Sequence, residues 1–445
     1  MPRLVQHGDS LPSWWRVIAA GLSLCAVATP PAHADVGGTA DVSPQSAPQT
    51  LADLIAQFRR DNPQLKQARQ SYFAAKLQVP IAGALPAPQF GLLEQANTGG
   101  PFDFNRKSDF FAYYTFTQPF LWFGKRDLAA AVAKAQAEVV GRQYDTLELQ
   151  LVSQLKLGFY QFVALQDQLR FMDEDQRRLD QIKEISKVRY ANNAAAYVDF
   201  LNAQVAAGSL ENERYALQKQ IQSAKEQINT LRGQDSQALL DLRDQDGSPH
   251  LPSQPLAELI KLAQHTNPVV AGSQSQIEAA EKSVALAHKA FWPDFQVSLG
   301  GYADPSIVQL QTLRAYSVGI SINLPSWGFS KEEAGLGQAQ AQLDATRAGA
   351  QATLQQVDLA EANAYHGLET ALKQLRFTKE RLLPLAQTTY RLALTGYSSN
   401  GGTAFADLLQ AQTGLRSAEL AQIQAENAAL QAYVNLAAAI GKDPE

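Results

Sequence analysis

The stretch KRDLAAAVAKAQAEVVGRQYDTLELQLVSQLKLGFYQFVALQDQLRFMDEDQRRLDQIKEISKVRY, residues 125–190, decides the fold of this chain. It contains no proline and only two glycines, and as one helix it would be about 100 Å long. Charged side chains recur along it, which excludes a helix that spans a membrane. Its apolar side chains alternate between spacings of three and four and predict a coiled-coil seam, formed by Leu151, Leu155, Phe162, Leu165, Leu169 and Met172. One helix of a large soluble bundle is the alternative that this segment alone leaves open.

The composition of the whole chain bounds its class. The 445 residues are 45% hydrophobic and 18% charged, which allows two or three domains with a core. The formal net charge is −5 with acids and bases intermixed, so no basic surface for nucleic acid is predicted. After residue 34, no apolar run is long enough for a transmembrane helix.

The N-terminus has the pattern of a secretory signal peptide over residues 1–34. A polar segment is followed by an apolar one, and the sequence AHA at 32–34 predicts cleavage before Asp35. The single cysteine, Cys25, lies in the apolar segment, so the secreted chain would contain none. Two alternatives remain: an uncleaved anchoring helix, and a lipoprotein cut before Cys25, for which Leu24 is a poor preceding residue.

The same series of motifs occurs twice, at nearly constant spacing. LADLIAQFRRDNP at 51–63 returns as LAELIKLAQHTNP at 256–268, and YVDFLNAQ at 197–204 returns as FADLLQAQ at 405–412. Several motifs in one order are hard to obtain by chance, so two copies of one structural unit are predicted. The expected divisions are a signal peptide (1–34), a flexible leader (35–50), a first repeat (51–232), a linker (233–255), a second repeat (256–440) and a tail (441–445).

Each repeat is predicted to contain a helix, two strands, a long helix and a shorter helix, so the fold is mainly α with a small β part. In the first repeat, the opening helix begins near Leu51, is interrupted at Asn62-Pro63 and ends near Val79. The other expected elements of this repeat are strands over Gln89–Gln95 and Asp109–Gln118, the long helix from Lys125, and a helix over Tyr197–Leu231. In the second repeat, the long helix carries the same seam and is expected to kink at Pro384.

The sequence YSVGISINL, residues 316–324, alternates between apolar and small or polar side chains. This alternation is typical of a strand between lipid and a watery lumen, and it places Val318, Ile320 and Ile322 on the lipid face. A strand with one face on a soluble core would show the same pattern. If the strands lie in a membrane, four per chain are too few to close a barrel, and open edges do not survive in lipid. The chain would then have to oligomerise.

These features together resemble the family of TolC-like outer-membrane efflux proteins over about residues 51–440. The resemblance implies a homotrimer whose strands form a twelve-stranded outer-membrane β-barrel, continued by a periplasmic α-helical coiled-coil barrel. It implies three kinds of partner besides lipid: the other copies, a periplasmic membrane-fusion adaptor, and an inner-membrane pump of the resistance-nodulation-division (RND) type. QPFLWFGK at 118–125 and ALPAPQF at 84–90 look most like the heavy-metal branch, so heavy-metal cations are the expected cargo. Drugs, solvents and type I secreted proteins are the alternative cargoes.

The resemblance also places the functional end of the helices at two turns, residues 191–200 and 397–409. It implies a periplasmic gate formed by Asp199, Asp407, Gln410 and Tyr397, and adaptor-contacting turns formed by Asn192, Asn193, Gly401, Gly402 and Thr403. Two glycines permit a tight turn, and Thr403 is expected to cap the next helix. Gln410 and Ala404 depart from relatives that carry a second aspartate and an arginine there. The alternative for both aspartates is a structural role, since acids in a first helical turn favour the helix.

No enzymatic chemistry is predicted. The six histidines are scattered without the spacing of metal ligands, and no P-loop or dinucleotide motif occurs. The sequence therefore predicts no catalytic residue, cofactor or metal site. Two non-channel classes remain as alternatives: a secreted coiled-coil scaffold or adhesin, which leaves the strands and the duplication unexplained, and a periplasmic adaptor, whose lipoyl-like and β-barrel modules have no counterpart in the sequence.

Overall fold

The computed structural model describes residues 50–97, 109–240, 242, 250–303, 313–325, 327–399 and 402–442. All of them belong to one compact unit, Pro48–Glu445. The predicted signal peptide, nearly all of the leader, and Gly401 of the second tip turn lie outside the described residues.

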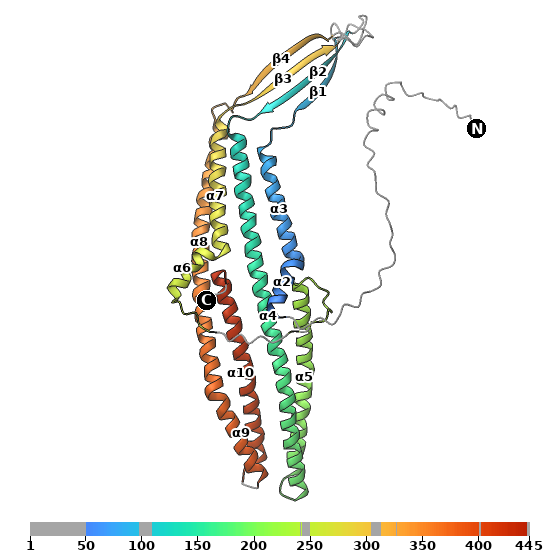
Figure 1. Cartoon of the computed structure of the whole chain (residues 1–445), viewed down its shortest axis with the longest axis vertical. Helices are drawn as coiled ribbons and strands as arrows, with labels where there is room; N and C mark the ends of the chain where they lie inside the picture. The colour runs from blue at the N-terminus through green and yellow to red at the C-terminus, as the bar shows by residue number, and fades with distance from the viewer. Residues whose placement is uncertain are drawn as a thin grey trace, which may run out of the picture. The chain divides into compact units, whose positions relative to one another are not determined.

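Two similar sets of elements follow one another along the chain (Figure 1). The first set is α2 (Leu51–Asp61), α3 (Pro63–Gly83), β1 (Gln89–Asn97), β2 (Asp109–Phe120), α4 (Lys125–Ala191) and α5 (Tyr197–Leu231). The second set is α6 (Leu256–Thr266), α7 (Pro268–His288), the short 3-10 helix η1 (Lys289–Phe291), β3 (Asp294–Ala303), β4 (Leu313–Asn323), α8 (Ser330–Phe377), the π-helical turn η2 (Thr378–Leu382), α9 (Leu383–Ser398) and α10 (Phe405–Ile440).

The predicted long helix is present over Lys125–Ala191, and the predicted Tyr197–Leu231 helix has those same bounds. Several predicted ends were wrong. The first strand runs on past Gln95 to Asn97, because its pairing with β2 continues to that residue. The opening helix continues through Pro80 to Gly83, because α3 packs along α4 and Arg126 donates two hydrogen bonds (2.9 and 2.8 Å) to the carbonyl of Gly83. The second strand runs on to Phe120, because its ladder with β3 continues to that residue.

An asparagine joins two helices end to end in each repeat. The amide oxygen of Asn62 accepts a hydrogen bond from the first turn of α3 (2.9 Å), and its amide nitrogen donates to the carbonyl of Leu231 at the end of α5 (2.6 Å). Asn267 makes the equivalent pair of bonds, one within α7 (2.9 Å) and one to Ala439 in α10 (2.7 Å). The Asn-Pro motif that interrupts the helical pattern is therefore the point where one helix is stacked on another, with proline at the first helical position.

The predicted seam of the long helix forms the core. Leu155 and the neighbouring Phe159 are almost completely buried and pack in one cluster with Leu54 and Phe58 of α2. The other seam residues, Leu151, Phe162, Leu165 and Met172, are buried in the same cluster, and Leu169 is partly buried. Met172 is thus a core residue.

The second repeat repeats this seam with two polar exceptions, one of which is Thr378 at the position of Met172. When the two seams are matched position by position, Glu361 of α8 takes the place of Leu155, and like Leu155 it is 0% exposed. Both of its carboxylate oxygens are buried without a hydrogen-bond partner. Burial, and secondarily the charge of Asp358, raise the pKa of Glu361 to about 7. The seam therefore contains a buried acid where the first repeat has a leucine.

The four strands form one antiparallel sheet in the order β1-β2-β3-β4, at the opposite end of the long helices from the helix-to-helix turns (Figure 1). The predicted alternation of β4 is present: Val318, Ile320 and Ile322 share one face and are 68, 71 and 57% exposed. Within this chain, β1 and β4 each pair on one side only, so the sheet has two open edges. Over the part of the chain that the structure describes, no helix combines the length and apolarity of a membrane span.

Candidate functional site

The first helix-to-helix turn lies between α4 and α5. Asn192 caps the end of α4, and Asn193 has a left-handed backbone (φ 57°), which asparagine tolerates better than most residues. Both side chains are exposed. On the two sides of the turn, the rings of Tyr190 and Tyr197 lie 5.2 Å apart. The turn thus presents polar side chains at its end and aromatic rings along its sides.

The second turn lies between α9 and α10, and Gly402 has a left-handed backbone (φ 81°) that favours glycine there. The expectation that Thr403 caps α10 was wrong. The N-cap is Ala404, which makes no side-chain cap, whereas the hydroxyl of Thr403 lies against Gly396 in the last turns of α9. A side chain at Gly396 would overlap that hydroxyl, so the glycine allows this turn to close.

Arg189, in the last turn of α4, connects the two turns. Its guanidinium donates a hydrogen bond to the backbone carbonyl of Tyr397, and another to the carbonyl of Ala194 in the first turn (3.0 Å). It also lies 4.6 Å from the centre of the Tyr397 ring. The role of Arg189 was not predicted from the sequence, because nothing in the local pattern of α4 indicates that carbonyls from two distant turns converge on one arginine.

Tyr397, predicted as a gate residue, is only 2% exposed. Its ring packs edge-on against Phe405 (5.7 Å between centroids), and its hydroxyl donates to the hydroxyl of Ser186 in α4 (3.4 Å). In a single chain, Tyr397 therefore packs the second turn against α4 and does not project from the tip.

The two predicted gate aspartates lie on opposite sides of α10. Asp199 lines a groove of about 610 Å³ between α5 and α10, and Asp407 lines a groove of about 490 Å³ between α9 and α10. Gln410 lines both grooves. The structure therefore brings each aspartate close to Gln410 but does not bring the two aspartates together within one chain.

Farther along the helices, a buried ionic network joins α4 to α10. Asp175 of α4 is completely buried and accepts a hydrogen bond from Gln412 (2.8 Å), while Arg178 and Arg416 lie 3.8 and 3.6 Å from its carboxylate. Burial raises the pKa of Asp175, and the hydrogen bond and the two arginines only partly oppose this. Arg178 also pairs with Glu419 of α10 (2.7 Å). The two helical hairpins are thus held together by a network of charges in which Asp175 is completely buried and its partners are partly exposed.

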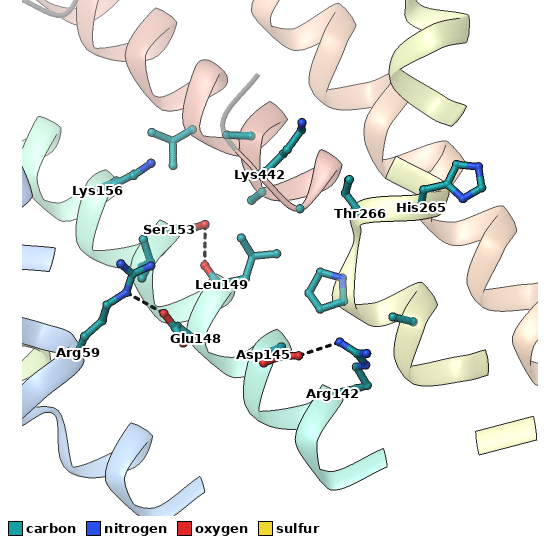
Figure 2. Close-up of a pocket in the computed structure, with 17 residues that line it drawn as sticks. Arg59, Arg142, Asp145, Glu148, Leu149, Ser153, Lys156, His265, Thr266 and Lys442 are labelled. Atoms are coloured by element: carbon teal, nitrogen blue, oxygen red, sulfur yellow. Dashed lines mark hydrogen bonds and ion pairs between the residues drawn. The ribbon is translucent and has the colours of Figure 1, made fainter. Parts of the chain in front are cut away.

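A separate pocket of about 560 Å³ lies where α2, α4, α6, α7 and the end of α10 meet (Figure 2). Two of its acids are paired within it: Glu148 with Arg59 (2.7 Å) and Asp145 with Arg142 (3.2 Å). Its other labelled polar residues are Ser153, Lys156, His265, Thr266 and Lys442. This pocket was not predicted from the sequence, because its walls come from both repeats. Among the described residues, no group of three or more His, Cys, Asp or Glu side chains could hold a metal ion.

A comparison with known families identifies the chain. Residues 54–234 and 259–442 match the family model described as "Outer membrane efflux protein". The chain belongs to the outer membrane efflux protein family. The two matched segments correspond to the two repeats seen in the structure, so the family pattern covers each repeat separately.

Individual members of the family are distant in sequence and similar in fold. The chain is 24% identical to the pyoverdine export outer membrane protein OpmQ of Pseudomonas aeruginosa, over 99% of this chain and 93% of that protein. It is 22% identical to the cobalt-zinc-cadmium resistance protein CzcC of Cupriavidus metallidurans, over 72% of this chain and 74% of that protein. The solved structure of the outer-membrane channel OprN superposes with a TM-score of 0.77 at 21% identity, covering 88% of this chain and 89% of that one.

Proposed function

We propose that three copies of this outer membrane efflux protein form one passive conduit. Their sheets close a twelve-stranded barrel in the outer membrane, and their helical hairpins line a periplasmic tunnel. A periplasmic membrane-fusion adaptor meets the tip turns, and an inner-membrane pump of the RND type supplies cargo and energy.

The observation that carries this proposal is the sheet. It has two open edges and one apolar face on which several side chains are more than half exposed, including Ile320 at 71% and Val318 at 68%. In water, such an apolar face would drive aggregation. In lipid, each unpaired backbone group on the open edges would cost several kcal/mol, so a single sheet with about ten such groups could not remain in the membrane alone. If copies pair edge to edge in lipid, the apolar face is covered by lipid and the edge backbone groups form hydrogen bonds.

The tip turns support the position of the adaptor and of the gate. The exposed Asn192 and Asn193 project from the first turn, and Asp199, Asp407 and Gln410 line grooves beside the second. In a trimer, Asp407 from three copies would form a ring of carboxylates at the entrance, which favours cations.

For the cargo, we propose heavy-metal cations, as for the relative named for cobalt, zinc and cadmium resistance. A conduit of this kind need not hold the metal, so the proposal does not depend on a metal site. The second candidate is pyoverdine or a similar organic compound, because the outer membrane protein named for pyoverdine export matches the chain over nearly its whole length. Resistance profiles of a deletion strain, complemented with this chain and challenged with divalent metals and with organic compounds, distinguish the two.

Two experiments test the conduit. Fractionation should recover the chain in outer membranes as a trimer, and recovery only as soluble periplasmic protein would exclude a channel. In planar bilayers, Asp407→Ala should alter cation conductance. The control is Asp344→Ala on α8, far from the tip, where the aspartate side chain is 77% exposed; this variant should leave the conductance unchanged. Equal conductance of Asp407→Ala and the unmodified channel would make Asp407 a structural residue of the first helical turn.

A further inference from the structure

The two short helices that open the repeats, α2 and α6, are equivalent in sequence but are held differently. Each lies against the long helix of its own repeat, α2 against α4 and α6 against α8 (Figure 1). The C-terminal end of α6 is fixed, because Thr266 and Asn267 donate hydrogen bonds to carbonyls at the end of α10 (2.6 and 2.7 Å). Asn62 fixes the end of α2 in the same way. The differences between α2 and α6 lie along the rest of each helix.

The N-terminal end of α2 is capped by a side chain and that of α6 is not. The hydroxyl of Thr50 accepts a hydrogen bond from the backbone of Asp53 (3.2 Å), and the carboxylate of Asp53 accepts one from the backbone of Thr50 (3.0 Å). In α6 the corresponding position is Pro255, which makes no side-chain cap. Because a cap satisfies backbone donors that a helix otherwise leaves unpaired, the first turn of α6 is less stable than that of α2.

The apolar surface that holds α6 is also smaller. α2 buries Leu51, Leu54 and Phe58, whereas α6 buries Leu259 and Ala263. When the repeats are matched, Ala263 takes the place of Phe58. Hydrophobic stabilisation rises with the apolar area removed from water, so α6 is held to its long helix more weakly than α2.

Glu361 of α8 divides the apolar contact with α6. One turn before it, Val357 packs in a cluster with Ala263, and two turns after it, Leu368 packs in a separate cluster with Leu259. In the first repeat, the leucine at the corresponding position joins the equivalent contacts into one cluster. A carboxylate thus interrupts the surface on which α6 is docked.

Among the described residues, nothing pairs with this carboxylate. The Glu361 side chain is 0% exposed, and neither oxygen has a hydrogen-bond partner. A residue of a neighbouring copy could not reach it, because the side chain is already fully covered within one chain. Ionisation of Glu361 is therefore unfavourable in this position, and burial raises its pKa to about 7.

In the part of the chain that the structure describes, the elements around Glu361 offer no compensating positive charge. Residues 268–277 of α7 and 428–440 of α10 contain no charged side chain. The titratable side chains of α6 are all exposed: Glu258, Lys261 and His265. On α8 itself, Asp358 is a second acid whose charge adds to the cost of ionising Glu361. Asp358 also accepts a hydrogen bond from Gln264 of α6 (3.0 Å).

We propose that Glu361 is a pH-dependent switch whose ionisation favours the release of α6 from α8. While it is protonated, the side chain stays buried and α6 stays docked. Once it has lost its proton, the side chain reaches water only when α6 moves away from α8. The bonds of Thr266 and Asn267 form the hinge of this movement, and the uncapped N-terminal end of α6 moves most. The switch lies within one chain and goes beyond the proposed conduit.

The direction of the pH dependence follows from the two states of α6. In the docked state Glu361 holds its proton up to about pH 7, and in the released state it ionises near its ordinary pKa of 4.5. The docked state therefore binds more protons, and release becomes more favourable as the pH rises from 4.5 to about 7. Each pKa unit is a factor of ten, so the equilibrium between docked and released α6 changes by up to about 300-fold.

Hydrogen exchange of the backbone amides of α6 tests this proposal. The protein is kept in its native assembly in detergent, and each exchange rate is compared with the intrinsic rate at the same pH to give a protection factor. Between pH 5 and pH 8, the protection of residues 260–266 should fall by roughly 70-fold, since a small part of the change is complete at pH 5. The equivalent amides of α2, residues 55–61, are the control in the same sample and should keep their protection.

Three variants separate the role of Glu361 from other effects of pH. Glu361→Gln should abolish the pH dependence of α6, and Glu361→Leu, with the residue found in the first repeat, should keep α6 protected at pH 8. The matched control Glu369→Gln, which removes a partly exposed acid of α8, should show the same fall as the unmodified chain.

The switch would be overturned by protection of α6 that does not change with pH in the unmodified chain, or by an equal fall in Glu361→Gln. An equal fall in α2 and α6 would also overturn it, because the whole protein would then be opening. None of these outcomes depends on the conduit, which fractionation and conductance test separately.

Discussion

Replacing Glu361 by glutamine should stabilise this protein at neutral and alkaline pH and have little effect in acid. Glu361 is completely buried on α8, and neither carboxylate oxygen has a hydrogen-bond partner. Glutamine has nearly the same shape and carries no charge at any pH, so the substitution removes the charge without opening a cavity. The control is Glu369→Gln, two turns farther along α8, where the carboxylate is partly exposed and paired with Lys373 (2.7 Å).

The magnitude follows from the shift in the pKa of Glu361, from 4.5 to about 7. Between these values, the folded chain holds a proton that the unfolded chain has lost, so the free energy of unfolding falls as the pH rises through this window. The penalty is absent below the unfolded pKa and complete above the folded one. At about 1.4 kcal/mol for each pKa unit, the full penalty is roughly 3 kcal/mol, an order-of-magnitude figure.

Urea unfolding of the purified protein in detergent, followed by circular dichroism at pH 5 and pH 8, measures this effect. The Glu361→Gln variant should gain on the order of 3 kcal/mol over the unmodified protein at pH 8 and much less at pH 5. Glu369→Gln should show a small effect of the opposite sign, because the bond to Lys373 lowers the pKa of Glu369. An equal gain for Glu361→Gln at both pH values would show that its buried charge does not carry the penalty and would refute the reasoning.

Three further outcomes are expected. Asn267→Ala should lower the free energy of unfolding by about 1–3 kcal/mol in the same assay, because the bonds that join α7 to α10 are lost and buried groups are left unpaired. Gly396→Ala should destabilise the second tip turn by displacing Thr403, which would be measured as faster proteolysis at that turn. Gly367→Ala, on an open face of α8, should instead raise the free energy of unfolding by about 0.5–1 kcal/mol. Asp294→Ala should lower the thermal stability of the join between β2 and β3, measured by heat-induced loss of sheet signal, because it removes the shared acceptor of two hydrogen bonds.

The sequence was sufficient to predict the elements of both repeats. The proline-free stretch from Lys125 predicted the long helix, its apolar spacing predicted the buried seam, and the repeated motifs predicted the duplication. These predictions held because helix length and seam depend on local periodicity, which tertiary contacts reinforce here. Predicted ends were less accurate, as at Pro80, where packing on α4 and the bonds from Arg126 extend a helix that local propensity would end.

The candidate site was predictable only in part. Glycine and asparagine in the turns indicated where the chain reverses, and Gly402 and Asn193 do have left-handed backbones. The role of Thr403 could not be predicted, because its contact with Gly396 depends on how α9 and α10 approach each other. Arg189 was missed for the same reason, since its partners are backbone carbonyls whose positions no sequence pattern records.

The sequence by itself determined the class of this protein: a duplicated unit with long seamed helices, short alternating strands and membership in the outer membrane efflux protein family. Only the tertiary structure decided how the units are joined. It placed Asn62 and Asn267 between stacked helices, buried Glu361 in a leucine position, and set the register that relates β2 to β3. The physical reason is that periodicity is a property of neighbouring residues, whereas hydrogen bonds, desolvation and strand register arise between residues far apart in the chain.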